Sequence, residues 1–99
     1  MISLEICATI AASKMLEFNQ SKLLFIDRLQ NFEGYAGFKE KAGDKFVMRI
    51  DWESRKNMNA FLDSEDYRFF HGAIITLSEN HKTHLIEKKK TNTDYKGFN

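Results

Sequence analysis

The stretch ISLEICATI, residues 2–10, alternates apolar and polar side chains along its whole length. The two alternating sets are Ile2, Leu4, Ile6, Ala8 and Ile10 on one side and Ser3, Glu5, Cys7 and Thr9 on the other. A period of two is typical of a strand, because successive side chains of an extended chain point to opposite faces. The stretch therefore predicts a β-strand with one buried face.

The segment that follows, residues 12–32, changes to a helical period. Its apolar side chains recur at spacings of three and four: Met15, Phe18, Phe25, Ile26 and Leu29. We expect Ser13 to be the N-cap, because a serine oxygen can accept a hydrogen bond from the first free N–H groups of a helix. Gly34 and Gly37 are expected to end the helix and turn the chain.

A hairpin is predicted next, with arms at residues 35–41 and 45–52 and a turn at 42–44. The second arm places its large apolar side chains on one face: Phe46, Met48, Ile50 and Trp52. The other face of this arm carries mostly charged side chains. We therefore expect a second half-buried strand here.

Two short helices and a last strand complete the pattern. Ser54 and Ser64 are the expected N-caps of the two helices, and the second helix should run from about 65 to 79. The side chains expected on its buried stripe are Phe69, Phe70, Ala73, Ile74 and Leu77. Residues 82–89 predict the last strand.

The predicted order is β-α-β-β-α-β with the second helix broken, which is the ferredoxin-like split βαβ plan of an α+β protein. We expect one domain at residues 1–90 and a polar tail at 91–99. Two helices cover only one face of a sheet, and both faces of this sheet carry apolar residues at several positions. A second copy would cover the remaining face, so the pattern predicts a homodimer.

Composition and charge limit the classes of function. The 99 residues include 15 basic and 14 acidic side chains, and a net charge of +1 gives no reason to expect binding to nucleic acid or to an anionic membrane. The single cysteine, Cys7, excludes a disulfide within the chain. No apolar run approaches the ~20 residues of a membrane span, and the N-terminus does not resemble a signal peptide, so we expect a cytoplasmic protein.

The histidines do not predict a metal site. His81 and His84 are three residues apart, but no cysteine or carboxylate accompanies them at the spacing of a zinc motif. The sequence also lacks a glycine-rich phosphate loop and an HExxH motif. We therefore expect no metal ligand set.

The stretch SEDYRFFHGA, residues 64–73, carries reactive side chains among aromatic ones. Tyr67 and His71 are four residues apart and share a helix face, as do Asn57 and Phe61 in the preceding helix. A phenol can donate a hydrogen bond, an imidazole can move a proton or ligate iron, and an amide can hold a polar ligand atom. Aromatic neighbours would suit a flat ligand. The alternative is ordinary amphipathic packing, with the polar tips in water.

The stretch DWESRKNMNAFLDSEDYRFFHGA, residues 51–73, resembles the antibiotic biosynthesis monooxygenase family, and the element order extends the resemblance over most of the chain. Members of that family show a tryptophan that closes a strand, a nearby serine and an S-x-x-[YFH] motif, which Trp52, Ser54 and Ser64 to Tyr67 match. The resemblance implies a ferredoxin-like subunit that pairs with a second copy into a dimeric α+β barrel. It also implies a pocket between sheet and helices.

One branch of the family oxidises polycyclic phenols to quinones with molecular oxygen and needs no cofactor. By similarity to that branch, Asn57 and Tyr67 match an asparagine and a tyrosine that surround the substrate ring. We assign Tyr67 to hydrogen bonding of a substrate oxygen, His71 to proton transfer, and Asn57 to holding a carbonyl or an oxygen species. The pocket walls are assigned to Phe61, Trp52, Phe70 and Cys7. Among these, Phe61 stands where the family has a tryptophan, so the N–H donor of that tryptophan is lost.

Two alternatives stay open from sequence. A second branch of the family degrades haem, and there His71 would ligate the iron, although Phe61 replaces an expected tryptophan and Cys7 an expected asparagine. The other alternative is a ligand-binding module without catalysis, in which Asn57, Phe61, Tyr67 and His71 only shape a cavity. In every case Cys7 could instead be a buried, unreactive thiol.

Overall fold

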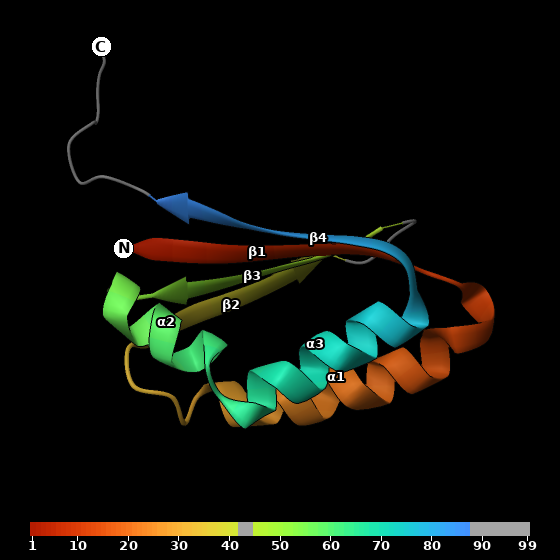
Figure 1. Cartoon of the computed structure of the whole chain (residues 1–99), viewed down its shortest axis with the longest axis horizontal. Coiled ribbons are helices and arrows are strands. Elements are labelled where there is room, and N and C mark those ends of the chain that lie inside the picture. The colour runs from red at the N-terminus through yellow and green to blue at the C-terminus, as the bar shows by residue number, and fades with distance from the viewer. Residues whose placement is uncertain (42–44, 88–99) are drawn as a thin grey trace, which may run out of the picture.

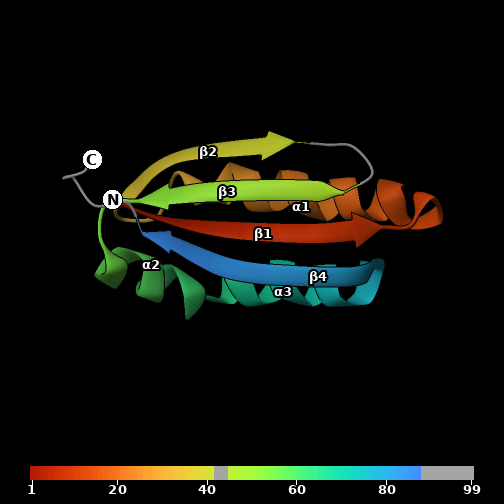
Figure 2. The same cartoon turned by 90° about the horizontal axis from the view of Figure 1, so that it is seen from above.

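The alternating stretch at the N-terminus becomes a strand with a neighbour on each side. The computed structural model describes residues 1–41 and 45–87, and its sheet has the order β2-β3-β1-β4 with every neighbouring pair antiparallel (Figure 2). The strands are β1 (Ile2–Ile10), β2 (Tyr35–Lys41), β3 (Phe46–Trp52) and β4 (Ser78–Glu87). This is the predicted ferredoxin-like α+β plan.

The helices all lie on one face of the sheet (Figure 1). They are the 3-10 turn η1 (Ala12–Lys14), α1 (Met15–Leu29), α2 (Arg55–Leu62) and α3 (Glu65–Leu77). In Figures 1 and 2, no described element of this chain covers the opposite face. That opposite side is called the open face below. No helix within the described ranges is long and apolar enough to cross a lipid bilayer.

The core lies between the sheet and the helices. Alternate residues of β1 and β3 are buried there, as their patterns predicted, including Leu4, Ile6, Met48, Ile50 and Trp52. From the helical side Phe25 and Phe70 stack face to face, with ring centroids 4.1 Å apart and an interplanar angle of 5°. Burial of one such side chain stabilises the fold by about 1.5–3 kcal/mol. Hydrophobic burial thus fixes which face of each element points inward.

Two of the three predicted helix caps are confirmed. Ser54 Oγ accepts from the Asn57 N–H at 3.1 Å, and Ser64 Oγ accepts from the Tyr67 N–H at 3.2 Å. The prediction for Ser13 is wrong, because Ser13 lies inside η1 and α1 begins after Lys14 without a side-chain cap. A 3-10 turn supplies its own i→i+3 hydrogen bonds, so the entry into α1 needs no serine cap.

The end of α3 and one of its stripe residues also differ from prediction. The helix ends at Leu77, because Ser78 takes an extended conformation (φ −98°, ψ 151°) and pairs with Ile10 in the sheet. β4 therefore begins four residues before the predicted position. Phe69 is 68% exposed and does not belong to the buried stripe. The predicted turn at 42–44 and the predicted tail at 91–99 lie outside the described residues.

The two glycines after α1 have different roles. Gly34 has φ +81°, a left-handed conformation that favours glycine, and it lies in the turn before β2. A Cβ added there would also overlap the side chain of Asn57. Gly37 does not end the helix but lies within β2, next to a shift in the register with β3. Only Gly34 therefore turns the chain in the way the sequence predicted.

Candidate active site

Tyr67 and His71 lie together on one face of α3. Their rings are nearly parallel, with centroids 5.5 Å apart and an interplanar angle of 14°. The Ser64 cap starts the helix three residues before Tyr67, so the cap fixes where this pair sits. The predicted shared face is therefore confirmed, and the structure brings two of the three expected catalytic side chains into contact.

The phenol of Tyr67 is buried against β4. Its hydroxyl shares a hydrogen bond with the side chain of Thr83. Burial raises the pKa of Tyr67 above its usual value, and the hydrogen bond with Thr83 only partly opposes that rise. Near neutral pH the side chain is thus a neutral phenol, which can donate a hydrogen bond to a ligand oxygen but cannot act as a base.

His71 connects this pair to solvent. Its side chain is half-buried, and its ring meets the exposed ring of His81 edge-on at a centroid distance of 6.1 Å. Thr83 and His81 of β4 pair with Ile6 and Ala8 of β1, whose side chains are buried under the helices. The two β4 side chains therefore point to the helical face, and the site opens at the edge between α3 and β4.

Aromatic side chains form a continuous wall behind Tyr67. The Phe61 ring lies 5.2 Å from Tyr67 and 4.7 Å from Trp52 between centroids, and Phe61, Trp52 and Phe70 are fully buried. These rings fill the space between sheet and helices in which the resemblance implied a pocket. The Trp52 indole Nε1–H is buried and has no hydrogen-bond partner among the described residues, so it is a donor left unsatisfied in the wall.

Asn57 is not brought to the Tyr67–His71 pair. It lies near the N-terminal end of α2, where its Oδ1 accepts from Ser54 Oγ at 2.6 Å and its side chain packs against Gly34. Tyr67 follows the other end of α2. The contacts of Asn57 hold the start of α2 against the turn before β2, which is a structural role.

Cys7 lies on the open face, away from the aromatic wall. It pairs with Val47 of β3 and Lys82 of β4, and its side chain is half-buried. Burial raises the pKa of the Cys7 thiol, and the charge of Glu5 adds to that rise. Glu5, Cys7 and His84 offer ligand atoms that all lie within 4.8 Å of one another. Strand pairing thus places a cysteine and a carboxylate beside His84, which the spacing along the sequence did not indicate.

A separate surface hollow of about 380 Å³ lies between α1 and α3. Its lining is Leu24, Phe25, Arg28, Glu65, Asp66 and Phe69. An ion pair crosses it, with Arg28 Nη1 at 2.7 Å from Asp66 Oδ1. None of the residues assigned to the site from sequence lines this hollow. No sequence pattern predicted this hollow, because it depends on Phe69 pointing outward.

No protein-family model matches the chain, and no curated protein matches it in sequence. Solved structures do match it. A candidate antibiotic biosynthesis monooxygenase from Nitrosomonas europaea superposes with a TM-score of 0.79 at 15% identity, over 89% of this chain and 98% of that chain. A conserved protein from Methanosarcina mazei Go1 gives a TM-score of 0.82 at 13% identity, over 89% and 92% of the two chains.

The matching structures include SnoaB from Streptomyces nogalater, which is described as a cofactor-independent oxygenase. Its TM-score is 0.76 at 12% identity, over 94% of this chain and 97% of that chain. Identities this low show the fold alone. The resemblance to antibiotic biosynthesis monooxygenases is thus confirmed at the level of the fold, and over most of the chain.

Proposed function

We propose that the chain is an oxygenase-type enzyme that oxidises an aromatic or quinol-type small molecule with molecular oxygen and without a cofactor. The observation that carries the proposal is the Tyr67–His71 pair, a neutral buried phenol beside a half-exposed imidazole at the rim of an aromatic wall. The shared fold with SnoaB, an oxygenase described as cofactor-independent, supports it.

The proposed chemistry uses the two side chains in different ways. His71 takes a proton from a phenolic substrate, and the resulting anion passes electrons to oxygen. A ring C–H of the phenol becomes a second carbonyl, so one O2 is consumed and one water is released per quinone formed. Tyr67 donates a hydrogen bond to the substrate oxygen and stabilises the negative charge that develops there. Phe61 and Phe70 support the face of the wall behind Tyr67.

The substrate would approach from the edge between α3 and β4. His71 is half-buried there, and the neighbouring β4 side chains His81 and Thr83 are exposed. A flat ring can stack against the imidazole at this edge while its oxygen replaces Thr83 as the partner of the Tyr67 hydroxyl. Asn57 and Cys7 have no part in this proposal, because their side chains make contacts elsewhere.

The test is oxygen uptake by the purified protein with a panel of hydroquinones and polycyclic phenols, followed with an oxygen electrode and by product absorbance. We expect uptake to fall at least ~10-fold in His71→Gln and in Tyr67→Phe, in the range general acid–base groups contribute. Tyr35→Phe is the matched control, because it removes a half-buried phenol outside the pair. Saturable binding of the panel without oxygen uptake would replace the proposal with a ligand-binding module.

The residues around His71 do not fit haem. The Tyr67 ring stacks on one side of the imidazole, His81 lies edge-on to it, and the wall behind is fully buried. Titration with haemin should therefore give no saturable absorption band, and a band that disappears in His71→Gln would contradict this conclusion.

We also propose that the open face pairs with a second copy of the chain. The face is more polar than the sequence pattern suggested, with Val47 of β3 and Ile86 of β4 as its aliphatic side chains within the described strands. Two of its charges are already partnered within the chain, since Arg49 Nε lies 3.7 Å from Asp51 Oδ1 and the Ser3 hydroxyl donates to Asp51. Paired charges can be covered at lower cost than isolated ones.

Sedimentation of the wild type and of Val47→Asp tests the pairing. A dimer that dissociates when a carboxylate replaces this aliphatic side chain of the open face is the expected result. Ile75→Asp is the control, because Ile75 is 52% exposed on α3, on the helical side of the molecule. A monomeric wild type, or a Val47→Asp dimer as stable as the wild type, would contradict the proposal.

A further inference from the structure

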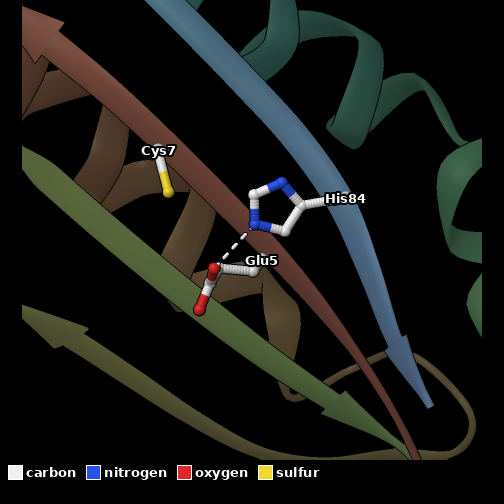
Figure 3. Close-up of side chains that lie close together, drawn as sticks. All are labelled: Glu5, Cys7 and His84. Carbon is white, nitrogen blue, oxygen red and sulfur yellow. Dashed lines mark hydrogen bonds and ion pairs between the residues drawn. The ribbon is translucent and has the colours of Figure 1, made fainter.

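We propose that Glu5, Cys7 and His84 form a binding site for a zinc-class divalent cation on the open face of the sheet. Figure 3 shows the three side chains projecting from this face, two from β1 and one from β4. They bring the single thiol of the sequence together with an imidazole and a carboxylate. The site lies on the opposite side of the sheet from Tyr67 and is independent of the oxidation proposed above.

The strand pairing is what brings the three ligands together. Glu5 and His84 are directly opposite each other in the β1–β4 register, and His84 Nε2 lies 2.7 Å from Glu5 Oε1. Cys7 follows Glu5 by two residues and so lies on the same face of β1. The ligand atoms lie within 4.8 Å of one another. This triangle spans two strands held by backbone hydrogen bonds, so the Cα positions of its ligands are fixed.

The donor set matches a zinc-class ion. Zinc binds thiolate at ~2.3 Å and imidazole nitrogen or carboxylate oxygen at ~2.0–2.2 Å, so ligand atoms around one ion lie ~3.3–3.7 Å apart. To bind one ion, the 2.7 Å distance between Glu5 and His84 must lengthen and the widest separation of the ligand atoms must shorten, each by about 1 Å. Rotation of the half-buried Glu5 and Cys7 side chains provides these changes. Thiolate and carboxylate together supply two negative charges for a divalent cation.

Nearby cations set a limit on the affinity. Lys82 is the register partner of Cys7, and Arg49 is the register partner of Glu5. Arg49 is directed to Asp51, with its Nε 3.7 Å from Asp51 Oδ1. The charges of Lys45 and, to a smaller extent, Lys82 act on the Cys7 thiol, and either positive charge repels a bound divalent cation. Replacement of Lys82 by Gln should therefore strengthen binding.

Three ligands from one face of the sheet would leave a fourth coordination position on the side away from the sheet. A tetrahedral ion with three ligands from one strand pair keeps one position for water or for a group from a covering molecule. In the chain itself the bound ion would join β1 to the edge strand β4 by side chains as well as by backbone hydrogen bonds. Metal binding should therefore raise the midpoint of thermal unfolding by mass action.

The experiment is titration of the reduced, metal-free full-length chain with Co²⁺, followed by absorbance, and with Zn²⁺, followed by calorimetry. We expect one ion per chain and a thiolate-to-cobalt charge-transfer band in the near ultraviolet. Cys7→Ser should abolish the band. His84→Gln and Glu5→Gln should each weaken binding at least ~10–100-fold, the effect that even outer-shell changes produce.

His81→Gln is the matched control for His84→Gln. His81 lies on the same strand but points to the helical face, where it meets His71. Its replacement should leave both the charge-transfer band and the affinity unchanged. Cobalt binding without a thiolate band, binding that survives in Cys7→Ser and His84→Gln, or binding that is lost in His81→Gln would each overturn the proposal. Circular dichroism and Trp52 fluorescence establish that each variant is folded.

Discussion

Phe69 and Phe70 are neighbours in α3 with opposite environments, since Phe69 is 68% exposed and Phe70 is fully buried in a face-to-face stack with Phe25. Successive helix residues point about 100° apart, so only one of the pair can face the core. The choice depends on the rotation of α3 around its axis. Both rings are apolar, so the apolar pattern left that rotation open.

Replacement of Phe70 by Ala should lower the free energy of unfolding by about 3–5 kcal/mol, because it leaves a cavity in the centre of the aromatic core. Phe69→Ala is the matched variant and should change it by no more than about 0.5 kcal/mol. Urea unfolding followed by fluorescence of the single, fully buried Trp52 measures both values. Equal losses in the two variants would mean that α3 is rotated differently.

Gly34→Ala should destabilise the chain by about 1–3 kcal/mol, because the position has φ +81° and the new methyl group would overlap Asn57. Gly72→Ala provides the opposite control. Gly72 lies within α3 with open space around it, so alanine there should stabilise the helix by about 0.5–1 kcal/mol. The sign of the change in denaturation midpoint distinguishes the two sites, and a neutral Gly34→Ala would contradict the described turn.

Ser64→Ala should lower the free energy of unfolding by about 1 kcal/mol, because Ser64 Oγ accepts from the Tyr67 N–H and donates to the Phe61 carbonyl at 2.6 Å. The same change at Ser13 should have an effect below about 0.5 kcal/mol, because that side chain is exposed and caps no helix. Chemical denaturation of both variants tests this difference. A loss at Ser13 as large as that at Ser64 would restore the capping role that its sequence position suggests.

Tyr67 should make stability fall at high pH. Its folded pKa lies above the usual value of 10.0 because of burial, so ionisation favours the unfolded chain. The stability that the buried neutral phenol contributes is fully present below about pH 10, and it is lost as the pH rises through the raised pKa of the folded state. The free energy of unfolding should therefore decline more steeply above about pH 10 in the wild type than in Tyr67→Phe. Parallel declines in urea titrations across this range would contradict a buried phenol.

The sequence predicted the sheet and the helices where burial alternates regularly. The alternation in residues 2–10 and 45–52 identified the buried faces of β1 and β3, because a period of two assigns each side chain to a face without knowledge of its neighbours. The capping serines Ser54 and Ser64 were likewise local signals. The start of β4 was missed because Ser78 owes its extended conformation to pairing with Ile10 at the far end of β1.

Only those features of the site that depend on residue spacing within one helix were predicted from the sequence. Tyr67 and His71 share a face because they are four residues apart on a helix, and the structure confirms their contact. Asn57 and Cys7 were assigned by resemblance, and the structure places both away from this pair. The meeting of Glu5 with His84 could not be read from spacing, because the two residues are 79 positions apart and meet only through strand pairing.

The position of β1 between β3 and β4 has a consequence for synthesis of the chain. One edge of β1 can pair as soon as β3 has emerged, with Ile2 opposite Trp52, whereas the other edge waits for β4, the last described strand. During that interval the nascent chain presents unpaired strand backbone, which can associate with other chains. β4 therefore completes the backbone pairing of β1 and removes this free edge. Chains that stop before Ser78 should aggregate, although every aromatic residue of the core is already present.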